Sequence, residues 1–439
     1  EDGIRDQPRS RGLGDVYKRQ LRVFVYHEGR YIELESQIYN LNFTDSSHIR
    51  SCNVVFLIPD FADGSERYFV FYSDEETSSP YYEDHVSLKE GRFYYEPISG
   101  YKADVRYYMI EEDGYTPFLV CYDGSVTGLS FSQRVIKLKE KSRGISLNNW
   151  LLAATYALMY LDESKSTGSV SSNERFLSKK VFVDGNLMVK FGIESESADR
   201  NIITKNVYTY YYSPISDKRI IVSSYQRVKD KRISTGLGAQ GGVIASMITS
   251  IIKSTNIKEL NTGVFIPYLH FPSEENILKE YRFPRDIGVT CWKWIILPKD
   301  DEDLSKEPWI SLDFGKDGET FALLFTNNTF LSEGRSGLQI SAGVSKWIDM
   351  PGLLIQGMGA AVGRNSYEKG EEEILELPSN FETRFVSEFF YTKDGYEKVQ
   401  DELKMFAKVF SSYDMKERWN DKDNAYKETH DLTFIPTLQ

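Results

Sequence analysis

A long succession of short alternating segments constrains this chain more than any other feature. From residue 21 onward, runs of β-branched and aromatic residues alternate with polar ones and are separated by Gly, Pro, Asp and Ser. Period-two runs bounded by turn residues, about 8–15 residues apart, are typical of antiparallel sheets. Tyr occurs 29 times and Phe 26 times, and both residue types favour strands. The sequence therefore predicts a mainly β fold with large antiparallel sheets.

Charge and cysteine content exclude several classes of function. The 439 residues carry a net charge of −12, whereas a nucleic-acid partner usually requires a basic face. No stretch reaches the roughly 18 apolar residues of a membrane-spanning helix. The three cysteines, Cys52, Cys121 and Cys291, are far apart, and no metal-ligand motif includes them. They permit one disulfide, between Cys52 and Cys121, or three buried free thiols. No metal and no cofactor is predicted.

Residues 1–20 differ from the rest of the chain in their pattern of apolar and polar residues. They show no hydrophobic period, and the alternating pattern begins abruptly at Leu21. The segment resembles a translated library adapter of the kind found at the ends of metagenomic reading frames, with VYKRQ at its junction. We therefore expect residues 1–20 to be non-native and any targeting signal to be missing from the sequence. A natural disordered tail is the alternative.

The remaining sequence divides into four parts. We predict an N-terminal β-sandwich over 21–140, a helical bridge and linker over 141–178, and a second β domain over 179–413 that ends in an amphipathic helix. We expect 414–439 to be a tail, which could be truncated. The bridge contains the apolar run Trp150–Leu161, for which we predict a buried helix. The amphipathic helix is predicted over 394–412, because apolar residues recur there at steps of three and four.

The order of these parts resembles that of multidomain polysaccharide-degrading proteins whose core is a galactose-mutarotase-like β-supersandwich. Local support comes from Gly370–Thr392, in which a Gly-Glu turn leads into a strand that ends in aromatic residues. The resemblance implies a β-supersandwich over the second domain. It implies a carbohydrate-related role, although fold alone does not establish an activity.

Two glycine-rich runs could suggest a nucleotide site. The run from Gly236 to Gly242 is not preceded by a buried strand, and the run from Gly357 to Gly363 is followed by polar residues rather than by a helix. A dinucleotide site needs both features. The sequence therefore predicts neither a nucleotide-binding loop nor nucleotide chemistry.

The strongest candidate for chemistry is the segment Ile266–Phe283. Tyr268 and His270 share strand parity, and Glu280 and Arg282 do the same on a possible return strand. Removal of the C5 proton of a uronate requires a base, often Tyr or His, together with a cation that neutralises the sugar carboxylate. These four residues could supply both. The alternative is a solvated sheet face on which the histidine is hydrogen-bonded and has no catalytic role.

Two further groups of residues could bind substrate. One is a polar loop cluster made of Arg364, Asn365 and Tyr367. The other consists of tryptophans whose ring faces could stack on sugars, namely Trp292 and Trp294, with Trp309 and Trp347 as further candidates. Tryptophans in β-rich proteins are also commonly buried in the core, which is the alternative for all four.

These observations favour a secreted or cell-envelope carbohydrate-active protein whose partner is a polysaccharide or another glycan. Our first hypothesis is a lyase that cleaves uronic-acid polymers by β-elimination. The second is a non-catalytic glycan-binding or surface protein of the same architecture. The third is a glycoside hydrolase, which needs two carboxylates facing a cleft. The sequence makes no prediction about oligomeric state.

Overall fold

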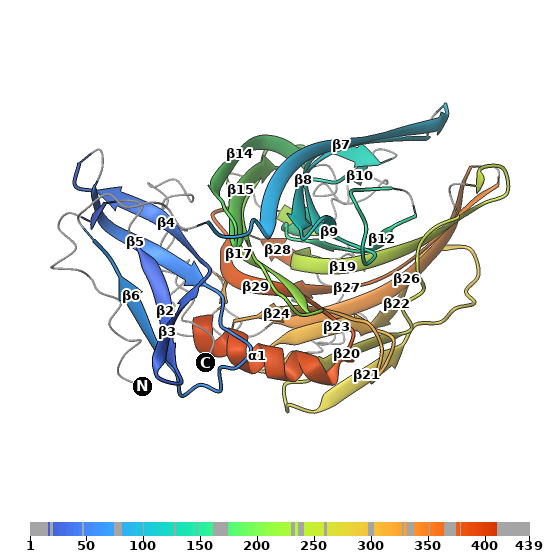
Figure 1. Ribbon diagram of the computed structural model, residues 1–439. Coiled ribbons are helices and arrows are strands. Elements are labelled where there is room, and N and C mark those ends of the chain that lie inside the picture. Colours follow the sequence, from blue (N-terminus) through green and yellow to red (C-terminus); the bar gives the residue numbers. More distant parts are fainter. Residues whose placement is uncertain are drawn as a thin grey trace.

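The computed structural model describes residues 16–17, 21–45, 48–73, 81–99, 101–126, 129–146, 148–160, 174–229, 233–235, 241–258, 261–296, 303–326, 329–331, 338–350, 352–363, 375–377 and 379–410. It confirms the predicted fold class. Two large antiparallel sheets pack face to face, and in the described part of the chain one helix lies outside them, near the C-terminus (Figure 1).

The first large sheet has eleven strands. Its path runs β22 (Thr290–Ile296), β26 (Gln339–Met350), β27 (Leu353–Gly363), β19 (Gly241–Ser254), β12 (Trp150–Thr155), β11 (Arg134–Leu138), β9 (Tyr115–Val126), β8 (Tyr101–Glu112) and β7 (Val86–Ile98), with β10 (Leu129–Ser130) beside β9 and β13 (Met159–Tyr160) beside β19. Strands from both sides of residue 140 share this sheet. The predicted domain boundaries at 140 and 178 therefore do not coincide with a break in the sheet. Whether the parts on either side fold separately stays a prediction.

The second large sheet has ten strands. Its path runs β14 (Arg175–Asp184), β15 (Met188–Glu196), β16 (Ile202–Tyr211), β17 (Lys218–Val228), β29 (Glu382–Thr392), β24 (Thr320–Phe325), β23 (Trp309–Asp313), β20 (Tyr268–Pro272) and β21 (Leu278–Arg282), with β25 (Phe330–Leu331) beside β29. A separate pair joins β18 (Ile233–Thr235) to β28 (Leu375–Leu377). The hairpin β20–β21 thus forms one edge of the ten-stranded sheet.

Strands β1 to β6 form two small sheets beside the large ones (Figure 1). One contains β2 (Arg22–His27), β3 (Arg30–Leu34) and β6 (Arg67–Phe71), and the other contains β4 (Ser36–Phe43), β5 (His48–Phe56) and β1 (Val16–Tyr17). Within residues 1–20 only Val16–Tyr17 is described, so the adapter interpretation stays a prediction. The Gln37 side chain accepts hydrogen bonds from the backbone N–H groups of Leu187 and Met188 and thereby ties this part to the ten-stranded sheet.

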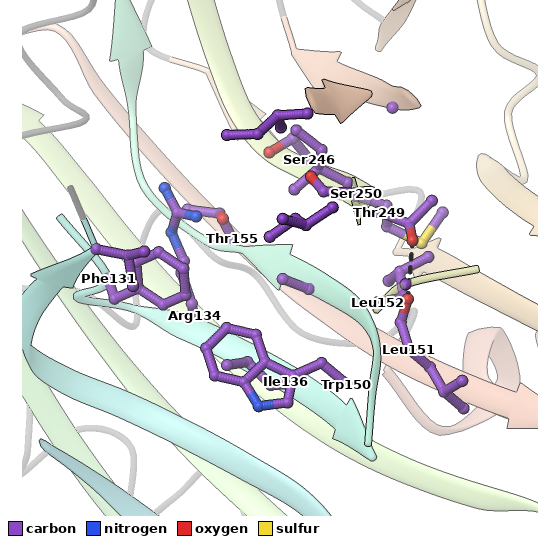
Figure 2. A pocket seen from close by; sticks show the side chains of 18 of the residues that line it. Phe131, Arg134, Ile136, Trp150, Leu151, Leu152, Thr155, Ser246, Thr249 and Ser250 are labelled. Atoms are coloured by element: carbon purple, nitrogen blue, oxygen red, sulfur yellow. Dashed lines mark hydrogen bonds between the residues drawn. The ribbon is translucent and has the colours of Figure 1, made fainter. Parts of the chain in front are cut away.

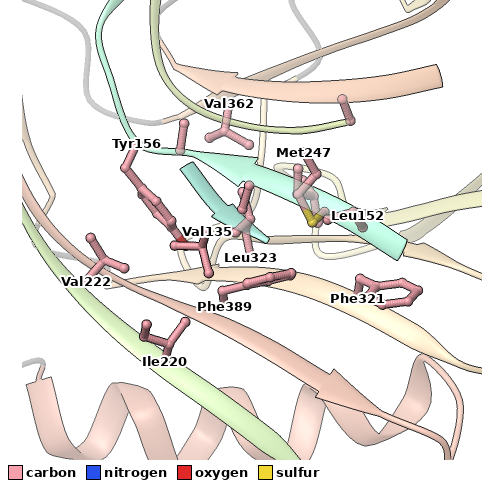
Figure 3. Packing of buried hydrophobic residues seen from close by; sticks show 14 of the residues in the cluster. Val135, Leu152, Tyr156, Ile220, Val222, Met247, Phe321, Leu323, Val362 and Phe389 are labelled. Atoms are coloured by element: carbon pink, nitrogen blue, oxygen red, sulfur yellow. The ribbon is translucent and has the colours of Figure 1, made fainter. Parts of the chain in front are cut away.

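The main core lies between the two large sheets. Figure 3 shows Val135, Leu152 and Met247 of the eleven-stranded sheet facing Leu323 and Phe389 of the other. Each of these side chains is at most 2% exposed. The alternation seen in the sequence thus directs one face of each sheet inward.

Helix α1 (Glu397–Phe410) covers the outer face of the ten-stranded sheet. Its Val399, Leu403 and Phe406 pack against a layer that includes the buried Trp309. The amphipathic pattern is therefore confirmed, but the helix begins at Glu397 rather than at 394. The cause is Gly395, whose φ of +82° lies in the left-handed region and cannot belong to a right-handed helix.

The predicted buried helix over Trp150–Leu161 is wrong. Trp150–Thr155 forms strand β12, which pairs with β11 and β19 in the middle of the eleven-stranded sheet. A strand that is covered on both faces has apolar residues on both faces, so its sequence lacks alternation and cannot be told from a buried helix. The Ser/Gly-rich linker predicted in the same region lies mostly at 161–173, outside the described residues.

The sequence contains the pairs Asp113–Gly114 and Asp123–Gly124, each of which is typical of a hairpin turn, and the structure places them differently. Asp113 and Gly114 connect β8 to β9 with φ values of +46° and +81°, as a tight hairpin turn requires. Gly124, in contrast, lies inside β9 next to a register shift, with φ +106°. A Cβ atom there would lie 2.1 Å from the Asp104 carbonyl oxygen, so the second Asp-Gly pair marks a bulge and not a turn.

Candidate functional site

The hairpin β20–β21 brings the four predicted catalytic residues together. Tyr268 is the register partner of Arg282, and His270 is the register partner of Glu280. Strand alternation directs Leu269 into the main core and leaves these four positions on the opposite face, toward α1. The predicted strand parity and the predicted return strand are therefore both present, whereas the catalytic role of these residues stays a prediction.

His270 lies between two carboxylates. Its Nδ1 is 2.8 Å from Oδ2 of Asp313, and its Nε2 is 3.0 Å from Oε2 of Glu280. The His270 and Asp313 side chains are 1% and 0% exposed, whereas the Glu280 side chain is 60% exposed. The arrangement therefore links a buried carboxylate to a solvent-facing one through a single imidazole ring.

Neighbouring groups hold His270 and Asp313 in place. The Ser311 hydroxyl donates a hydrogen bond of 2.7 Å to the Asp313 carboxylate, and the Gly315 N–H donates one of 2.9 Å. The Tyr396 ring, one residue before α1, stacks on His270 with 3.9 Å between the ring centres. The imidazole is thus fixed by hydrogen bonds in its plane and by an aromatic ring on one face.

The electrostatics of the site favour a charged histidine. Burial alone lowers the pKa of His270, but the hydrogen bonds and negative charges of Asp313 and Glu280 outweigh burial and raise the pKa above its usual value. In the charged form both ring nitrogens carry protons and can donate to the two carboxylates. A histidine in this state cannot accept a further proton, so the geometry suits it to positioning Glu280.

The exposed rim of the site carries the remaining polar groups. The guanidinium of Arg282 lies 6.0 Å from the centre of the Tyr268 ring, and the Arg282 side chain is exposed. Tyr268 is half-buried, and its ring lies close to Gly315. A phenol, a guanidinium and a carboxylate therefore share one solvent-facing surface. These three groups, the buried His270 and Asp313 beneath them and the Tyr396 ring form what we call the hairpin cluster: Tyr268, His270, Glu280, Arg282, Asp313 and Tyr396.

Sequence reasoning missed Asp313 and Tyr396. Asp313 lies in the segment PWISLDFG, and only the pairing of β20 with β23 brings it next to His270. Tyr396 falls within 394–412, for which the sequence predicts only an amphipathic helix. The sequence did contain one signal, because Ser311 and Asp313 are polar residues at alternate positions of a strand. That signal points to His270 only once β23 is known to pair with β20.

The other predicted substrate-binding residues lie elsewhere. Trp294 is half-buried in β22, which belongs to the eleven-stranded sheet, and Trp292 is in the same strand with its side chain outside the described part. Arg364, Asn365 and Tyr367 lie outside the described residues. Their roles stay predictions, and the structure does not bring the tryptophans of β22 into the hairpin cluster.

Comparison with known proteins finds only distant structural likenesses. No protein-family model matches the sequence, and no curated protein matches it. Among solved structures, a GH36 α-galactosidase, AgaA from Geobacillus stearothermophilus in complex with stachyose, is 14% identical with a TM-score of 0.34, covering 72% of this chain and 43% of that one. The α-galactosidase from Lactobacillus brevis is 8% identical with a TM-score of 0.32, covering 72% and 41%.

A third structure is a shorter protein. The Slr1438 protein from Synechocystis sp. PCC 6803 is 8% identical with a TM-score of 0.26, covering 72% of this chain and 99% of that one. The chain spans about two fifths of the length of the two α-galactosidase structures. At these values the likenesses assign neither a family nor an activity, and functional conclusions rest on the chain's own residues.

The described ranges contain no group of three or more His, Cys, Asp or Glu side chains that could hold a metal ion. Cys52 and Cys121 are free thiols, so they do not form the disulfide that the sequence permitted. The same ranges contain no helix with the length and apolar character needed to cross a membrane.

The raised pKa of His270 implies that the free energy of unfolding depends on pH. A raised folded-state pKa contributes stability that is fully present below the unfolded value, about 6.5, and is lost as the pH rises through the folded value. We expect His270→Gln to lower the free energy of unfolding by about 1–3 kcal/mol at about pH 5.5. The loss should shrink steadily toward about pH 9, in urea titrations followed by fluorescence.

His48 provides the control for this measurement, because its carboxylate partner Asp45 has a side chain that is 51% exposed. His48→Gln should change stability by less than about 1 kcal/mol at every pH. A His270→Gln loss that is equal at both ends of the pH range would contradict a protonated imidazole.

Proposed function

We propose that this chain is a carbohydrate-active protein that cleaves uronic-acid polymers by β-elimination at the hairpin cluster. The observation that supports this most directly is the register of β20 and β21, which sets Tyr268 opposite Arg282 and His270 opposite Glu280. It gives one exposed edge a proton-transfer group, a cation and an anchored carboxylate. In the same proposal the protein acts outside the cytoplasm, where acidic polysaccharides occur.

The roles follow from the chemistry of elimination. Tyr268, as its phenolate, removes the proton from C5; the electron pair forms the C4–C5 double bond, and the C4–O4 bond breaks. The same phenol then returns its proton to the departing O4, so that atoms and charge balance. His270 is a poor candidate for the base because both its ring nitrogens already face carboxylates.

Arg282 neutralises the uronate carboxylate. That negative charge would otherwise oppose removal of the neighbouring proton, and guanidinium groups bind carboxylates with two parallel hydrogen bonds. The guanidinium lies 6.0 Å from the centre of the Tyr268 ring, so the cation and the phenol face the same side of the hairpin. Glu280, held by the His270–Asp313 pair, accepts hydrogen bonds from sugar hydroxyls and orients the ring.

A panel of polymers tests the proposal. The whole chain is incubated with polygalacturonate, alginate, a glycosaminoglycan and a neutral glucan, and the ultraviolet absorbance of the new C4–C5 double bond is followed. We expect absorbance to rise with at least one uronic-acid polymer and not with the neutral glucan.

Three other results would overturn the lyase assignment. New reducing ends without a double bond indicate glycoside hydrolysis. Binding without turnover indicates a glycan-binding protein, and the absence of both binding and turnover removes the carbohydrate assignment itself.

A further inference from the structure

A pocket of about 390 Å³ opens on the face of the eleven-stranded sheet that points away from the main core (Figure 2). Its lining is drawn from eight strands of that sheet, from β7 to β26, and includes the rings of Phe93, Phe131, Trp150 and Trp347. The volume is more than twice that of the roughly 150 Å³ engineered cavity known to bind benzene. It falls within the range of small-molecule sites in proteins. The hairpin cluster lies on the other large sheet, so this pocket is a separate site.

Small side chains at matched register positions make the pocket. One row across the sheet pairs Thr155 with Ser246 and Ser246 with Ala361. The next row includes Gly359, at which a Cβ would lie 2.7 Å from the Met247 carbonyl oxygen. The glycine run Gly357–Gly363, which resembled a nucleotide loop only superficially, is therefore a strand whose small residues leave space above the sheet.

The lining is mainly apolar, with several Ser and Thr hydroxyl groups and a single charged residue among the described residues. In the described residues that line the pocket there is no Asp, Glu, Asn, Gln, His or Lys, and Arg134 is the one cation. The Arg134 guanidinium lies 4.4 Å from the centre of the Phe131 ring, and Figure 2 shows the two side chains next to each other. A cation in such surroundings is costly unless an anion accompanies it.

Two buried donors in the pocket lack acceptors within the described part of the chain. They are Nε of Arg134 and Nε1 of Trp150. Glu174 acts on Arg134 through its charge, and its carboxylate oxygens accept hydrogen bonds from Ser195 and Thr204. Buried donors are normally paired, so unpaired ones in a pocket indicate an acceptor supplied by a ligand.

We infer that this pocket binds an organic carboxylate with an apolar body, whose carboxylate pairs with Arg134 and whose body lies against the aromatic and aliphatic lining. Arginine binds carboxylates with a planar fork of donors, which explains the need for a guanidinium at this position. The Thr249 hydroxyl does not compete for the ligand, because it lies 2.9 Å and 3.2 Å from the carbonyl oxygens of Leu151 and Val264. Aromatic and aliphatic side chains make up most of the lining, which favours a ligand with an apolar body over the sugar polymer proposed above.

Titration calorimetry with four probes tests the inference, all below their critical micelle concentrations. Decanoate has both the charge and the apolar body, decanol has only the body, acetate has only the charge, and decyl phosphate carries a different anion. We expect saturable binding of one decanoate per chain, with decanol and decyl phosphate at least about tenfold weaker and acetate unmeasurable. Decanol or decyl phosphate binding as tightly as decanoate would overturn the carboxylate assignment.

Variants locate the binding. Arg134→Gln should weaken decanoate at least about tenfold and leave decanol unchanged, because a hydrogen bond to a charged group is lost. Arg106→Gln is the matched control, since Arg106 lies on the opposite face of the same sheet, paired with Asp123. Ser246→Phe fills the pocket from β19 while leaving the Arg134 side chain unaltered, and it should abolish binding of both probes.

Ser246→Phe tests the inference independently if Arg134→Gln fails to fold. Decanoate binding that survives Ser246→Phe, in protein shown to be folded by its near-ultraviolet circular dichroism, would place the ligand elsewhere and overturn the inference. Absence of saturable decanoate binding to the unaltered chain would overturn it directly. Neither result bears on the polymer assay, which depends on the hairpin cluster alone.

Discussion

Tyr268→Phe should lower the rate of β-elimination by about 10²–10⁴-fold, which is the usual effect of removing a proton-transfer group. The ring and its packing beside Gly315 remain in this variant, so the loss reports the hydroxyl and not a change of shape. Binding of the polymer should change little, because Arg282 and Glu280 remain in place. Initial rates of double-bond formation and an independent binding isotherm separate the two effects.

Tyr281→Phe is the matched control for this experiment. Tyr281 occupies the same strand as Arg282 but points to the opposite face, where its ring stacks on Phe271 with 5.8 Å between the ring centres. Its substitution should leave turnover within about threefold of the unaltered protein, an estimate that allows about 0.6 kcal/mol of indirect effect. If Tyr268→Phe retains full turnover, Tyr268 does not transfer the proton and the mechanism proposed for the hairpin cluster is wrong.

Arg282→Gln should weaken the binding of the polymer in addition to lowering the rate of elimination. The guanidinium interacts with a carboxylate that is present before and during the reaction, so its removal should weaken polymer binding as well as slow the reaction. This separates it from Tyr268→Phe, which should affect the rate alone.

The hairpin cluster shows what sequence reasoning could reach. Tyr268, His270, Glu280 and Arg282 lie within fifteen residues, so strand parity and one turn suffice to predict that they meet. Asp313 and Tyr396 come from two further elements, and their positions depend on β20 pairing with β23 and on α1 packing outside the sheet. Pairing partners of this kind depend on the whole fold, and local patterns do not specify them.

The pocket above the eleven-stranded sheet was beyond sequence reasoning for a related reason. Its lining extends from Phe93 to Ala361, and the rows of small residues become a hollow only when β12, β19 and β27 are aligned side by side. Taken alone, Arg134 looked like any polar residue of an alternating strand. The incorrect helix over Trp150–Leu161 would also have hidden the site, because it removed β12 from the sheet.

Lys218→Met should be the most destabilising single substitution proposed here, lowering the free energy of unfolding by about 3–5 kcal/mol. Lys218 donates hydrogen bonds to the carboxylate of Glu112 and to the carbonyl oxygens of Ser213 and Ile215, at 2.6 Å and 2.8 Å. The side chains of Lys218 and Glu112 are 7% and 1% exposed. Glu112 lies at the end of β8 and Lys218 at the start of β17, so the pair joins the two large sheets.

The cost arises mainly from the carboxylate left behind. Without Lys218, Glu112 keeps the hydroxyl groups of Tyr115 and Tyr210 as donors but has lost its positive partner in a buried place. The double variant Glu112→Gln/Lys218→Met removes both charges and should recover about 1–3 kcal/mol of the loss. Urea unfolding monitored by circular dichroism measures each variant, with Lys102→Met as the control, because the Lys102 pair with Asp104 is half-exposed and contributes at most about 1 kcal/mol. A loss below about 1 kcal/mol for Lys218→Met would mean that water reaches Glu112, and that this buried pair does not hold the two sheets together.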